Sequence, residues 1–367
     1  SCARGATLQL RAIPNAEPGM TPLEIWCNEA QERFVLAIKP KSLPVFEKIA
    51  KRERCPFAVV GEASNNETLQ VNDSQFDNDP IDIPMSLLFD DTARMQREDA
   101  HVNPIHAALD TKQIDIHDAV KRVLQFPCVG DKSFLITIGD RSVGGLVARD
   151  QMVGPWQVPV SDVAVTCASF EGYRGEALAM GERTPLALIH HAASARMAVG
   201  EAITNIAAAA IADISHLVLS ANWMAAADYP GEGAGLYDAV QTIGMELCPA
   251  LGISIPVGKD SLSMRTLWQD KGQTKSVTAP LSLIITAAAS VTDVRATLTP
   301  QLRTDRGETL LLLIDLGKGA NCLAGSVLAQ AYNMLGERPP DVDDPTALKQ
   351  FFTAIQLLNQ RDLVLSY

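Results

Sequence analysis

The stretch PLALIHHAASARMAVGEAITNIAAAAIADI, residues 185–214, decides the fold class of this 367-residue chain. Its alanine-rich composition strongly favours a helix. It is followed by the strand-like run HLVLSANW (216–223), a second helical stretch (233–251), and two further apolar runs, ISIPVG (253–258) and PLSLIITAAASV (280–291). Strands that alternate with helices in this way predict an α/β unit.

Elements on both sides of this unit follow from similar patterns. Upstream, SFLITIGDRSVGGLVARDQMV (133–153) contains two β-type runs around a glycine-containing turn, which predicts a hairpin. Downstream, TLLLLIDLG (309–317) predicts a strand and residues 324–335 predict a helix. Asp344 followed by Pro345 predicts the start of another helix, because aspartate is a favoured N-cap and proline a favoured first helical residue.

The first part of the chain predicts a separate α+β unit. Four short β-rich runs, LQLRAI, RFVLAI, FAVVGEA and TLQV, lie between Leu8 and Val71 around an amphipathic stretch at 42–54. Residues 76–117 lose any sustained period and predict a linker, which passes into the helix IHDAVKRVL (116–124).

Charge and cysteine content exclude several classes of protein. Thirty-one lysines and arginines against 43 acidic residues leave a formal net charge of -12, which excludes a general electrostatic role on nucleic acid or anionic membrane. The seven cysteines are scattered without a C-x-x-C pair, which is typical of reduced thiols in a cytosolic protein. Ser1 in place of a methionine and the apolar C-terminal run predict a piece of a longer polypeptide.

One constellation in the long helix could bind a metal ion. Glu201 and Asn205 are four residues apart and therefore lie on one helix face, and Asp162 in the turn PVSD is a third candidate. Carboxylate and amide oxygens suit Mg²⁺, which commonly also binds nucleotide phosphates. The alternative is structural: Glu201 pairs with Arg196 or a neighbouring strand, while Asn205 binds backbone groups.

Two glycine-containing stretches could bind phosphate. GKDS (258–261) directly follows a predicted strand, and DLGKGAN (315–321) lies between a predicted strand and a predicted helix. A plain strand-ending turn is the favoured explanation of GKDS, which is not a Walker A loop. The glycines of DLGKGAN could simply satisfy backbone geometry. The histidines support no catalytic triad, and structural roles are expected for His190, His191 and His216.

Five longer strings closely resemble the large, single-chain phosphoribosylformylglycinamidine synthases of purine biosynthesis. They are EPGMTPLEIWCNEAQERFVLAI (17–38), GDRSVGGLVARDQMVGPWQVPVSDVAV (139–165), VGEAITNIAAA (199–209), LSANWMAAA (219–227) and IPVGKDSLSM (255–264). They occur in the same order as in that family and extend over nearly the whole chain.

The resemblance implies an ATP-dependent ligase that converts formylglycinamide ribonucleotide (FGAR) to formylglycinamidine ribonucleotide (FGAM), with ammonia released from glutamine. Phosphoryl transfer activates the amide oxygen of the substrate and ammonia then displaces the phosphate, so positioning and Mg²⁺ neutralisation dominate catalysis. The implied fold is α/β (α+β), with duplicated aminoimidazole-ribonucleotide-synthetase-like (PurM-like) domains that are incomplete at both ends. The implied partners are these small molecules and the missing segments of the same polypeptide, in the cytoplasm, without nucleic acid or membrane.

The resemblance also implies a division into domains. Residues 1–90 would be the C-terminal part of the first repeat's PurM-C-like domain, and residues 91–125 a linker with a helix. Residues 126–295 would form the second repeat's PurM-N-like nucleotide-binding domain, and residues 305–367 would begin its PurM-C-like partner. In that family the second repeat retains ATP or ADP in a structural role.

Individual residues of this chain match functional positions of the family. The resemblance implies that Asp162, Glu201 and Asn205 hold magnesium at the auxiliary nucleotide, and that Ser161 and Lys132 contact the nucleotide itself.

The resemblance further implies a substrate contact in the first repeat. Glu29, Ala30 and Gln31 match an E-S-Q type motif that contacts substrate, with Ala30 in place of the usual serine. The family's amino-terminal ATP motif, catalytic histidine and glutaminase triad have no match, and its last magnesium aspartate is expected immediately beyond Tyr367. We therefore expect the chain to be inactive by itself.

Two other functions stay open. One is a non-catalytic nucleotide-binding scaffold, which the nucleotide stabilises by binding to the folded state. The other is a different ATP-using synthetase of the same superfamily, for instance one that acts on selenide or thiamine phosphate. That function requires a cysteine or substrate motif of its own, which the sequence does not contain.

Overall fold

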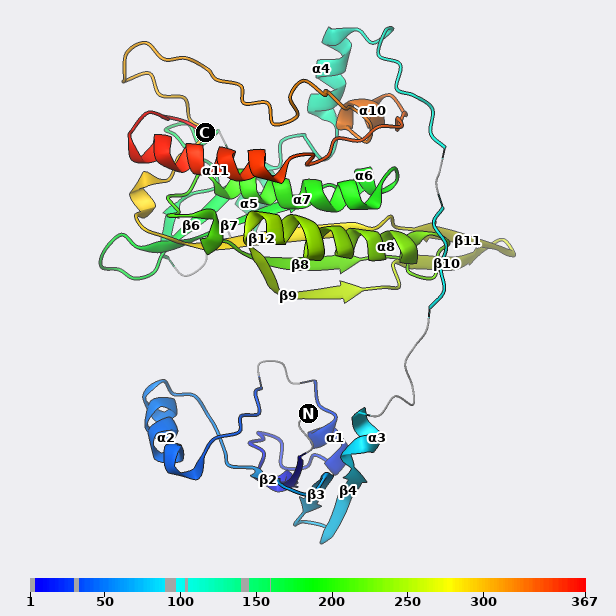
Figure 1. Cartoon of the computed structure of the whole chain (residues 1–367), viewed down its shortest axis with the longest axis vertical. Helices are drawn as coiled ribbons and strands as arrows, with labels where there is room; N and C mark the ends of the chain where they lie inside the picture. The colour runs from blue at the N-terminus through cyan, green and yellow to red at the C-terminus, as the bar shows by residue number, and fades with distance from the viewer. Residues whose placement is uncertain (1–3, 30–32, 90–96, 103–104, 140–144, 159) are drawn as a thin grey trace. The chain divides into compact units, whose positions relative to one another are not determined.

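The computed structural model divides the chain into two units, Ser1–Arg97 and Glu98–Tyr367 (Figure 1). It describes residues 4–367 except 30–32, 90–96, 103–104, 140–144 and 159. Each unit has its own sheet and its own buried residues. None of the helices in these described ranges is long and apolar enough to span a bilayer.

The first unit is built on a four-stranded sheet in the order β2-β1-β3-β4. It contains β1 (Gly5–Gln9), α1 (Pro22–Trp26), α2 (Leu43–Arg52), β2 (Gly61–Ser64), β3 (Thr68–Asp73), β4 (Asn78–Pro84) and α3 (Met85–Phe89). β1 pairs parallel with β3, and the other neighbours pair antiparallel. The helix predicted over residues 42–54 is confirmed by α2. The expectation of a structureless linker from residue 76 is wrong, because β4 and α3 occupy residues 78–89.

The strand that RFVLAI predicts at residues 33–38 is not formed. Phe34 and Val35 are 83% and 87% exposed. Aromatic and β-branched residues favour strands because they pack well on a half-buried pleated surface. Within the described part of the unit, residues 33–38 do not pack on a sheet surface of this kind. They therefore form neither a strand nor a helix.

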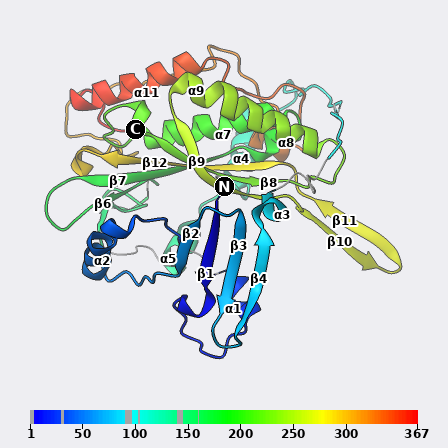
Figure 2. The ribbon, with the colours of Figure 1, turned by 60° about the horizontal axis from the view of Figure 1, so that its bottom comes forward.

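The second unit is built on a six-stranded sheet in the order β5-β6-β7-β12-β8-β9. Its strands are β5 (Val147–Arg149), β6 (Val163–Cys167), β7 (Gly175–Glu182), β8 (Val218–Met224), β9 (Ser254–Ser261) and β12 (Ser282–Val291). Neighbours are antiparallel except β8 and β9, which are parallel. A hairpin of β10 (Arg265–Asp270) and β11 (Gln273–Thr278) extends away from the end of this sheet (Figure 2).

Helices cover one face of this six-stranded sheet. The second unit contains the helices α4 (Ile116–Gln125), α5 (Ser133–Ile138), α6 (Thr184–Ala187), α7 (His191–Ile206), α8 (Glu232–Gln241), α9 (Cys248–Leu251), α10 (Val327–Ala331) and α11 (Pro345–Gln360). The long helix α7 lies on the sheet, and α11 lies on the far side of α7 (Figure 1). The predicted start of α11 is confirmed: the Asp344 carboxylate accepts a hydrogen bond from the Ala347 amide at 3.0 Å.

Small residues let α7 lie directly on the sheet. Along β7 the side chains alternate between buried and exposed, and the buried positions hold only glycine and alanine. The facing side of α7 is rich in alanine, with the fully buried Ile203 and Ile206 among them. The alanine-rich composition that predicts this helix therefore also sets its close packing on β7.

Other predictions in the second unit are wrong. Residues 133–138 form α5 instead of a strand, because the Asp131 carboxylate accepts hydrogen bonds from the Ser133 amide (3.0 Å) and hydroxyl (2.8 Å) and so opens a helical turn. Residues 309–317 form no strand, and each of the four leucines at 310–313 is at least 78% exposed. The helix expected at 324–335 is only the five residues of α10.

The single buried thiol among the described cysteines gives a chemical test of this core. Cys248 is buried, whereas Cys27, Cys55 and Cys128 are exposed. Burial raises the pKa of the Cys248 thiol to about 11. The thiolate is the reactive form, so we expect iodoacetamide at pH 8 to alkylate the three exposed cysteines while Cys248 stays unmodified until the protein unfolds. Mass spectrometry of the labelled peptides measures this, and equal labelling rates would contradict the described core.

Candidate functional site

Asp162, Glu201 and Asn205 come from two neighbouring parts of the second unit. Asp162 directly precedes β6, and the other two lie one turn apart on α7. The helix approaches β7 closely at Gly181, where an added Cβ would lie 2.0 Å from the Ala198 carbonyl oxygen. This close approach brings the polar face of α7 within hydrogen-bond distance of the β7 backbone.

Glu201 is held by the end of β7. One of its carboxylate oxygens, Oε2, accepts a hydrogen bond from the Glu182 amide at 2.7 Å, and Oε1 forms an ion pair with Arg183 Nη2 at 2.7 Å. Burial raises the pKa of Glu201 above its ordinary value, and the negative charges of Glu182 and Asp162 raise it further. Burial of the carboxylate is thus the main cause of the raised pKa, and a cation bound here would stabilise the charged form of Glu201.

Asn205 is held by the same strand. Its side-chain Nδ2 donates a hydrogen bond to the Met180 carbonyl at 2.9 Å. This bond fixes the orientation of the amide and leaves Oδ1 as the atom that could bind a ligand. An amide oxygen is a suitable ligand for a hard cation.

Tyr367 adjoins this group of residues, although no sequence pattern singles it out. Its hydroxyl donates to the Thr204 carbonyl at 2.7 Å, and its backbone amide donates to the Thr299 carbonyl at 3.0 Å. Burial raises the pKa of Tyr367 to about 12, and the charge of Asp162 contributes to this shift. Asp162 therefore acts electrostatically on both Glu201 and Tyr367, which places the three side chains in one neighbourhood.

The structural alternative for Glu201 is correct in part. Glu201 does bind a neighbouring strand, but its cationic partner is Arg183 instead of Arg196. Arg196 lies elsewhere on α7 and binds Asp341, with 2.7 Å between Nε and Oδ1.

A second buried contact fixes the C-terminal end of α7. The Gln356 side chain, on α11, donates to the Ala207 carbonyl at 2.8 Å and accepts from the Ile211 amide at 3.0 Å. Gln356 is buried, and its amide satisfies two backbone groups where α7 ends. Together with the Arg196 pair, this contact holds α7 from the side opposite the sheet.

The two residues expected to contact nucleotide lie in different settings. Ser161 is half-buried beside Asp162; its amide donates to the Gln151 carbonyl at 2.8 Å and its hydroxyl donates to the Val163 carbonyl at 3.1 Å. Lys132 is exposed at the start of α5, and its Nζ donates to the Gly130 carbonyl at 2.9 Å. No hydrogen bond or ion pair joins Lys132 to Asp162 within the described ranges.

The two phosphate-binding stretches considered above have structural roles. GKDS is the end of β9, where Gly258 pairs with Ala221 of β8, so the predicted turn is wrong. In DLGKGAN the Asp315 carboxylate itself accepts hydrogen bonds from the amides of Gly317 (2.9 Å) and Gly319 (2.6 Å). These two amides are therefore already bound by a carboxylate of the same loop.

Histidines near the start of α7 have structural partners. His190 caps the helix, with Nδ1 accepting from the Ala193 amide at 3.1 Å. His191 Nε2 lies 3.3 Å from a carboxylate oxygen of Glu232. No group of three histidine, cysteine, aspartate or glutamate side chains suited to a metal ion occurs in the described part of the chain. The candidate site therefore depends on an amide ligand as well as on carboxylates.

A cavity of about 550 Å³ opens in the second unit between residues 148–154, 295–303 and 359–365. Three arginines line it, and each has a partner within the chain. Arg149 donates to the Arg295 carbonyl at 3.3 Å, Arg295 pairs with Asp293, and Arg303 pairs with Asp305. Arg295 and Arg303 are thus paired with carboxylates, whereas the bond from Arg149 goes to an uncharged carbonyl oxygen and leaves its positive charge at the cavity.

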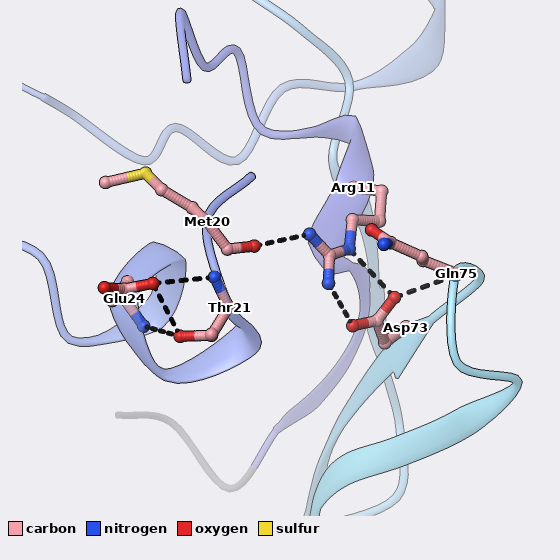
Figure 3. A network of polar contacts seen from close by, with 6 residues as sticks. All are labelled: Arg11, Met20, Thr21, Glu24, Asp73 and Gln75. Carbon is pink, nitrogen blue, oxygen red and sulfur yellow. Dashed lines mark hydrogen bonds and ion pairs between the residues drawn. The ribbon is translucent and has the colours of Figure 1, made fainter. Parts of the chain in front are cut away.

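The first unit contains the residues expected to contact substrate. Glu29 is exposed and lies three residues after Trp26, the last residue of α1. Ala30 and Gln31 lie outside the described residues. The segment that leads to Glu29 is tied to the sheet through Arg11 and Asp73, as Figure 3 shows.

Family models match both units. Residues 131–290 match the FGAR-AT PurM_N-like domain, and residues 2–74 match the C-terminal domain of AIR synthase related proteins. The expected mixed α/β fold with PurM-like domains is thereby confirmed.

Solved structures share this fold. PurL of Thermotoga maritima complexed with ADP is 18% identical with a TM-score of 0.52, and the comparison covers 82% of this chain and 44% of that chain. T. maritima PurL complexed with FGAR is 19% identical with a TM-score of 0.51, over 81% of this chain and 43% of that one. This chain thus spans less than half the length of the proteins it resembles. The two matched domains, an FGAR-AT PurM_N-like domain preceded by an AIR synthase related C-terminal domain, support the resemblance of this chain to a fragment of a phosphoribosylformylglycinamidine synthase.

Proposed function

We propose that this chain is the central part of an enzyme that converts FGAR, ATP, glutamine and water to FGAM, ADP, phosphate and glutamate. The observation that carries the proposal is the match of residues 131–290 to a domain model specific to FGAR amidotransferases. In the reaction, the γ-phosphoryl group passes to the amide oxygen of FGAR, and ammonia released from glutamine then displaces phosphate at the same carbon.

We assign residues 1–90 and 305–367 to the PurM-C-like parts of the two repeats, and residues 126–295 to the second PurM-N-like domain, with a linker at 91–125. The enzyme acts in the cytoplasm on small molecules, without nucleic acid or membrane. The remaining segments of the same polypeptide supply the catalytic histidine and the glutaminase triad. We expect the 367-residue chain by itself to make no FGAM from FGAR, ATP and ammonia.

The second unit is proposed to hold Mg²⁺ and a structural ADP or ATP. Asp162, Glu201 and the Asn205 Oδ1 would bind the ion, which would neutralise nucleotide phosphates. The residues fit it, because two carboxylates and an amide oxygen suit Mg²⁺ and because a cation would stabilise the charged form of Glu201, whose pKa burial raises. Arg183 would have to release Glu201 Oε1, while the bonds from the Glu182 amide and to the Met180 carbonyl keep both side chains oriented.

Contacts to the nucleotide are assigned to Ser161 and Lys132. Ser161 directly precedes Asp162, so a nucleotide whose phosphates reach the ion lies beside its hydroxyl. Lys132 is exposed and carries a positive charge that suits a phosphate. A structural nucleotide should stay bound to the protein during purification without being hydrolysed. This behaviour distinguishes a structural nucleotide site from a second catalytic centre, which would hydrolyse ATP.

Substrate contact is assigned to Glu29, with Ala30 and Gln31. The exposed carboxylate of Glu29 is a hydrogen-bond acceptor for hydroxyl or amide groups of FGAR. In the complete synthase, Glu29→Gln is expected to raise the KM for FGAR about 10-fold, because a charged acceptor is replaced by a neutral one. Steady-state assays of FGAM formation measure this change.

A matched variant controls for loss of charge in the first unit. Glu62 is an exposed carboxylate on β2, and Glu62→Gln should leave the KM for FGAR unchanged. Equal KM values for both variants would remove Glu29 from the substrate site. A complete synthase that turned over selenide or thiamine phosphate instead of FGAR would overturn the proposed reaction.

A further inference from the structure

A buried ion pair ties the loop before α1 to the sheet of the first unit. Asp73, the last residue of β3, is 1% exposed, and Arg11 lies in the turn that follows β1. The two form a bidentate pair, with Arg11 Nε 2.9 Å from Oδ1 and Nη2 2.7 Å from Oδ2 (Figure 3). The guanidinium lowers the pKa of Asp73, so the pair stays ionised at neutral pH.

Arg11 has a third bond that the sheet does not require. Its Nη1 donates to the carbonyl oxygen of Met20 at 2.9 Å, across a separation of nine residues (Figure 3). The two bonds to Asp73 fix the plane of the guanidinium, and this plane fixes the direction of the third donor. The position of Met20 relative to the sheet is therefore set by Asp73 through Arg11.

The segment after Met20 begins a helix that is capped at its start. The Thr21 hydroxyl accepts from the Glu24 amide at 3.3 Å, and the Glu24 carboxylate accepts from the Thr21 amide at 2.8 Å. This capping box begins α1, whose last turn closes where the Cys27 amide donates to the Leu23 carbonyl at 2.8 Å.

We infer that Arg11 and Asp73 are positioning residues for the substrate-contacting segment at Glu29, through the bond from Arg11 to the Met20 carbonyl and the capped helix α1. The inference rests on the proposed substrate role of Glu29. Neither residue of the pair touches substrate. Their effect is to hold the start of α1, and with it the chain two residues before Glu29, at one place on the sheet.

Two variants of the complete synthase separate this role from general stability. Arg11→Lys keeps a cation beside Asp73, but an ammonium group lacks the planar fork that binds the carboxylate and the Met20 carbonyl together. Asp73→Asn removes the charge that orients the guanidinium. Val71→Ala is the matched control, because Val71 is fully buried on the same strand and its truncation destabilises the unit without touching the loop.

The expected result is that Arg11→Lys and Asp73→Asn raise the KM for FGAR about 10-fold, since small displacements of positioning groups have large effects. Amide hydrogen exchange of residues 20–27 should accelerate in both variants. Val71→Ala, compared at an equal loss in thermal unfolding temperature, should leave both the KM and this local exchange near the values of the unchanged enzyme.

Two outcomes would overturn the inference, and they can be told apart. If Arg11→Lys and Asp73→Asn match Val71→Ala in KM and in exchange, the pair is merely structural while the substrate role of Glu29 stands. If Glu29→Gln itself leaves the KM for FGAR unchanged, the proposed substrate contact fails, and the positioning role fails with it.

Discussion

The Asp162→Asn, Glu201→Gln double variant is expected to bind Mg·ADP at least about 100-fold more weakly than the unchanged synthase, a loss of about 2.7 kcal/mol. Both substitutions keep the shape of the side chain and remove its negative charge. An ion such as Mg²⁺ relies on one or two carboxylates in addition to phosphate oxygens. With both carboxylates gone, Asn205 alone offers a neutral oxygen, which cannot offset the cost of removing water from the ion.

Calorimetric titration of Mg·ADP into the complete synthase measures this loss. The control is Glu176→Gln, which removes one charge from the exposed face of β7 and should leave the affinity unchanged. A double variant that binds like the unchanged enzyme would show that the ion is held elsewhere.

For Glu201→Gln, a direct loss of nucleotide binding can be distinguished from a loss of folding by whether the unfolding temperature of the nucleotide-free protein rises or falls. Burial raises the pKa of Glu201 in the folded protein. A carboxyl group whose pKa is higher in the folded protein than in the unfolded chain stabilises the fold at pH values below its pKa in the unfolded chain. This stabilisation is lost as the pH rises through its pKa in the folded protein. At neutral pH the Glu201 carboxylate therefore opposes folding of the nucleotide-free protein. Glu201→Gln should leave its unfolding temperature equal or slightly higher while nucleotide affinity falls.

The sequence predicts best where local pattern and packing require the same residues. The alanines of the stretch 185–214 favour the helix α7 (His191–Ile206) and are also the small residues that let it lie on β7, whereas residues 207–213 of that stretch are not helical. The Asp344–Pro345 pair predicts the start of α11 because an N-cap acts within a single turn.

Strand predictions fail for runs that are rich in strand-forming residues but have no sheet surface against which to pack. Residues 33–38 and 309–317 are rich in strand formers, yet their large side chains are mostly exposed and neither run is a strand. β-propensity measures how well a side chain fits a half-buried sheet, and the sequence of a short run does not say whether such a sheet is present. The opposite error occurs at GKDS, where glycine and charged residues suggest a turn but Gly258 allows close pairing with β8.

The candidate site shows the same limit at the level of side chains. Helical spacing predicts that Glu201 and Asn205 share a face, but it does not reveal their partners on β7. Arg183 lies 18 residues from Glu201 in the sequence, and Tyr367 lies 163 residues from Thr204. Such partners depend on tertiary structure and carry no local signal.

Gly181→Ala is expected to lower the free energy of unfolding of the second unit by about 3 kcal/mol, the upper end of what overpacking usually costs. The added methyl carbon would lie 2.0 Å from the Ala198 carbonyl oxygen and 2.6 Å from the Ala202 amide nitrogen. Both are backbone atoms of α7, so no side-chain rotation relieves the clash. The helix must move away from β7, and the fully buried Ile203 would then lose contacts with the sheet.

Denaturant unfolding measures this effect, and Gly244→Ala is the matched control. Gly244 lies in the helical stretch after α8, and a Cβ there meets no atom within 4 Å. Because alanine restricts the unfolded chain, Gly244→Ala should be neutral or stabilise by up to about 1 kcal/mol. Equal midpoints for the two variants would contradict the close approach of α7 to β7.

The same displacement should also abolish nucleotide binding. Moving α7 off the strand separates Glu201 from the Glu182 amide and Asn205 from the Met180 carbonyl, bonds of 2.7 and 2.9 Å that orient the two proposed ligands. Mg·ADP, which should raise the unfolding temperature of the unchanged enzyme by binding only the folded state, should raise that of Gly181→Ala little or not at all. A full thermal shift in this variant would mean that the ligands do not depend on the packing of α7 against β7.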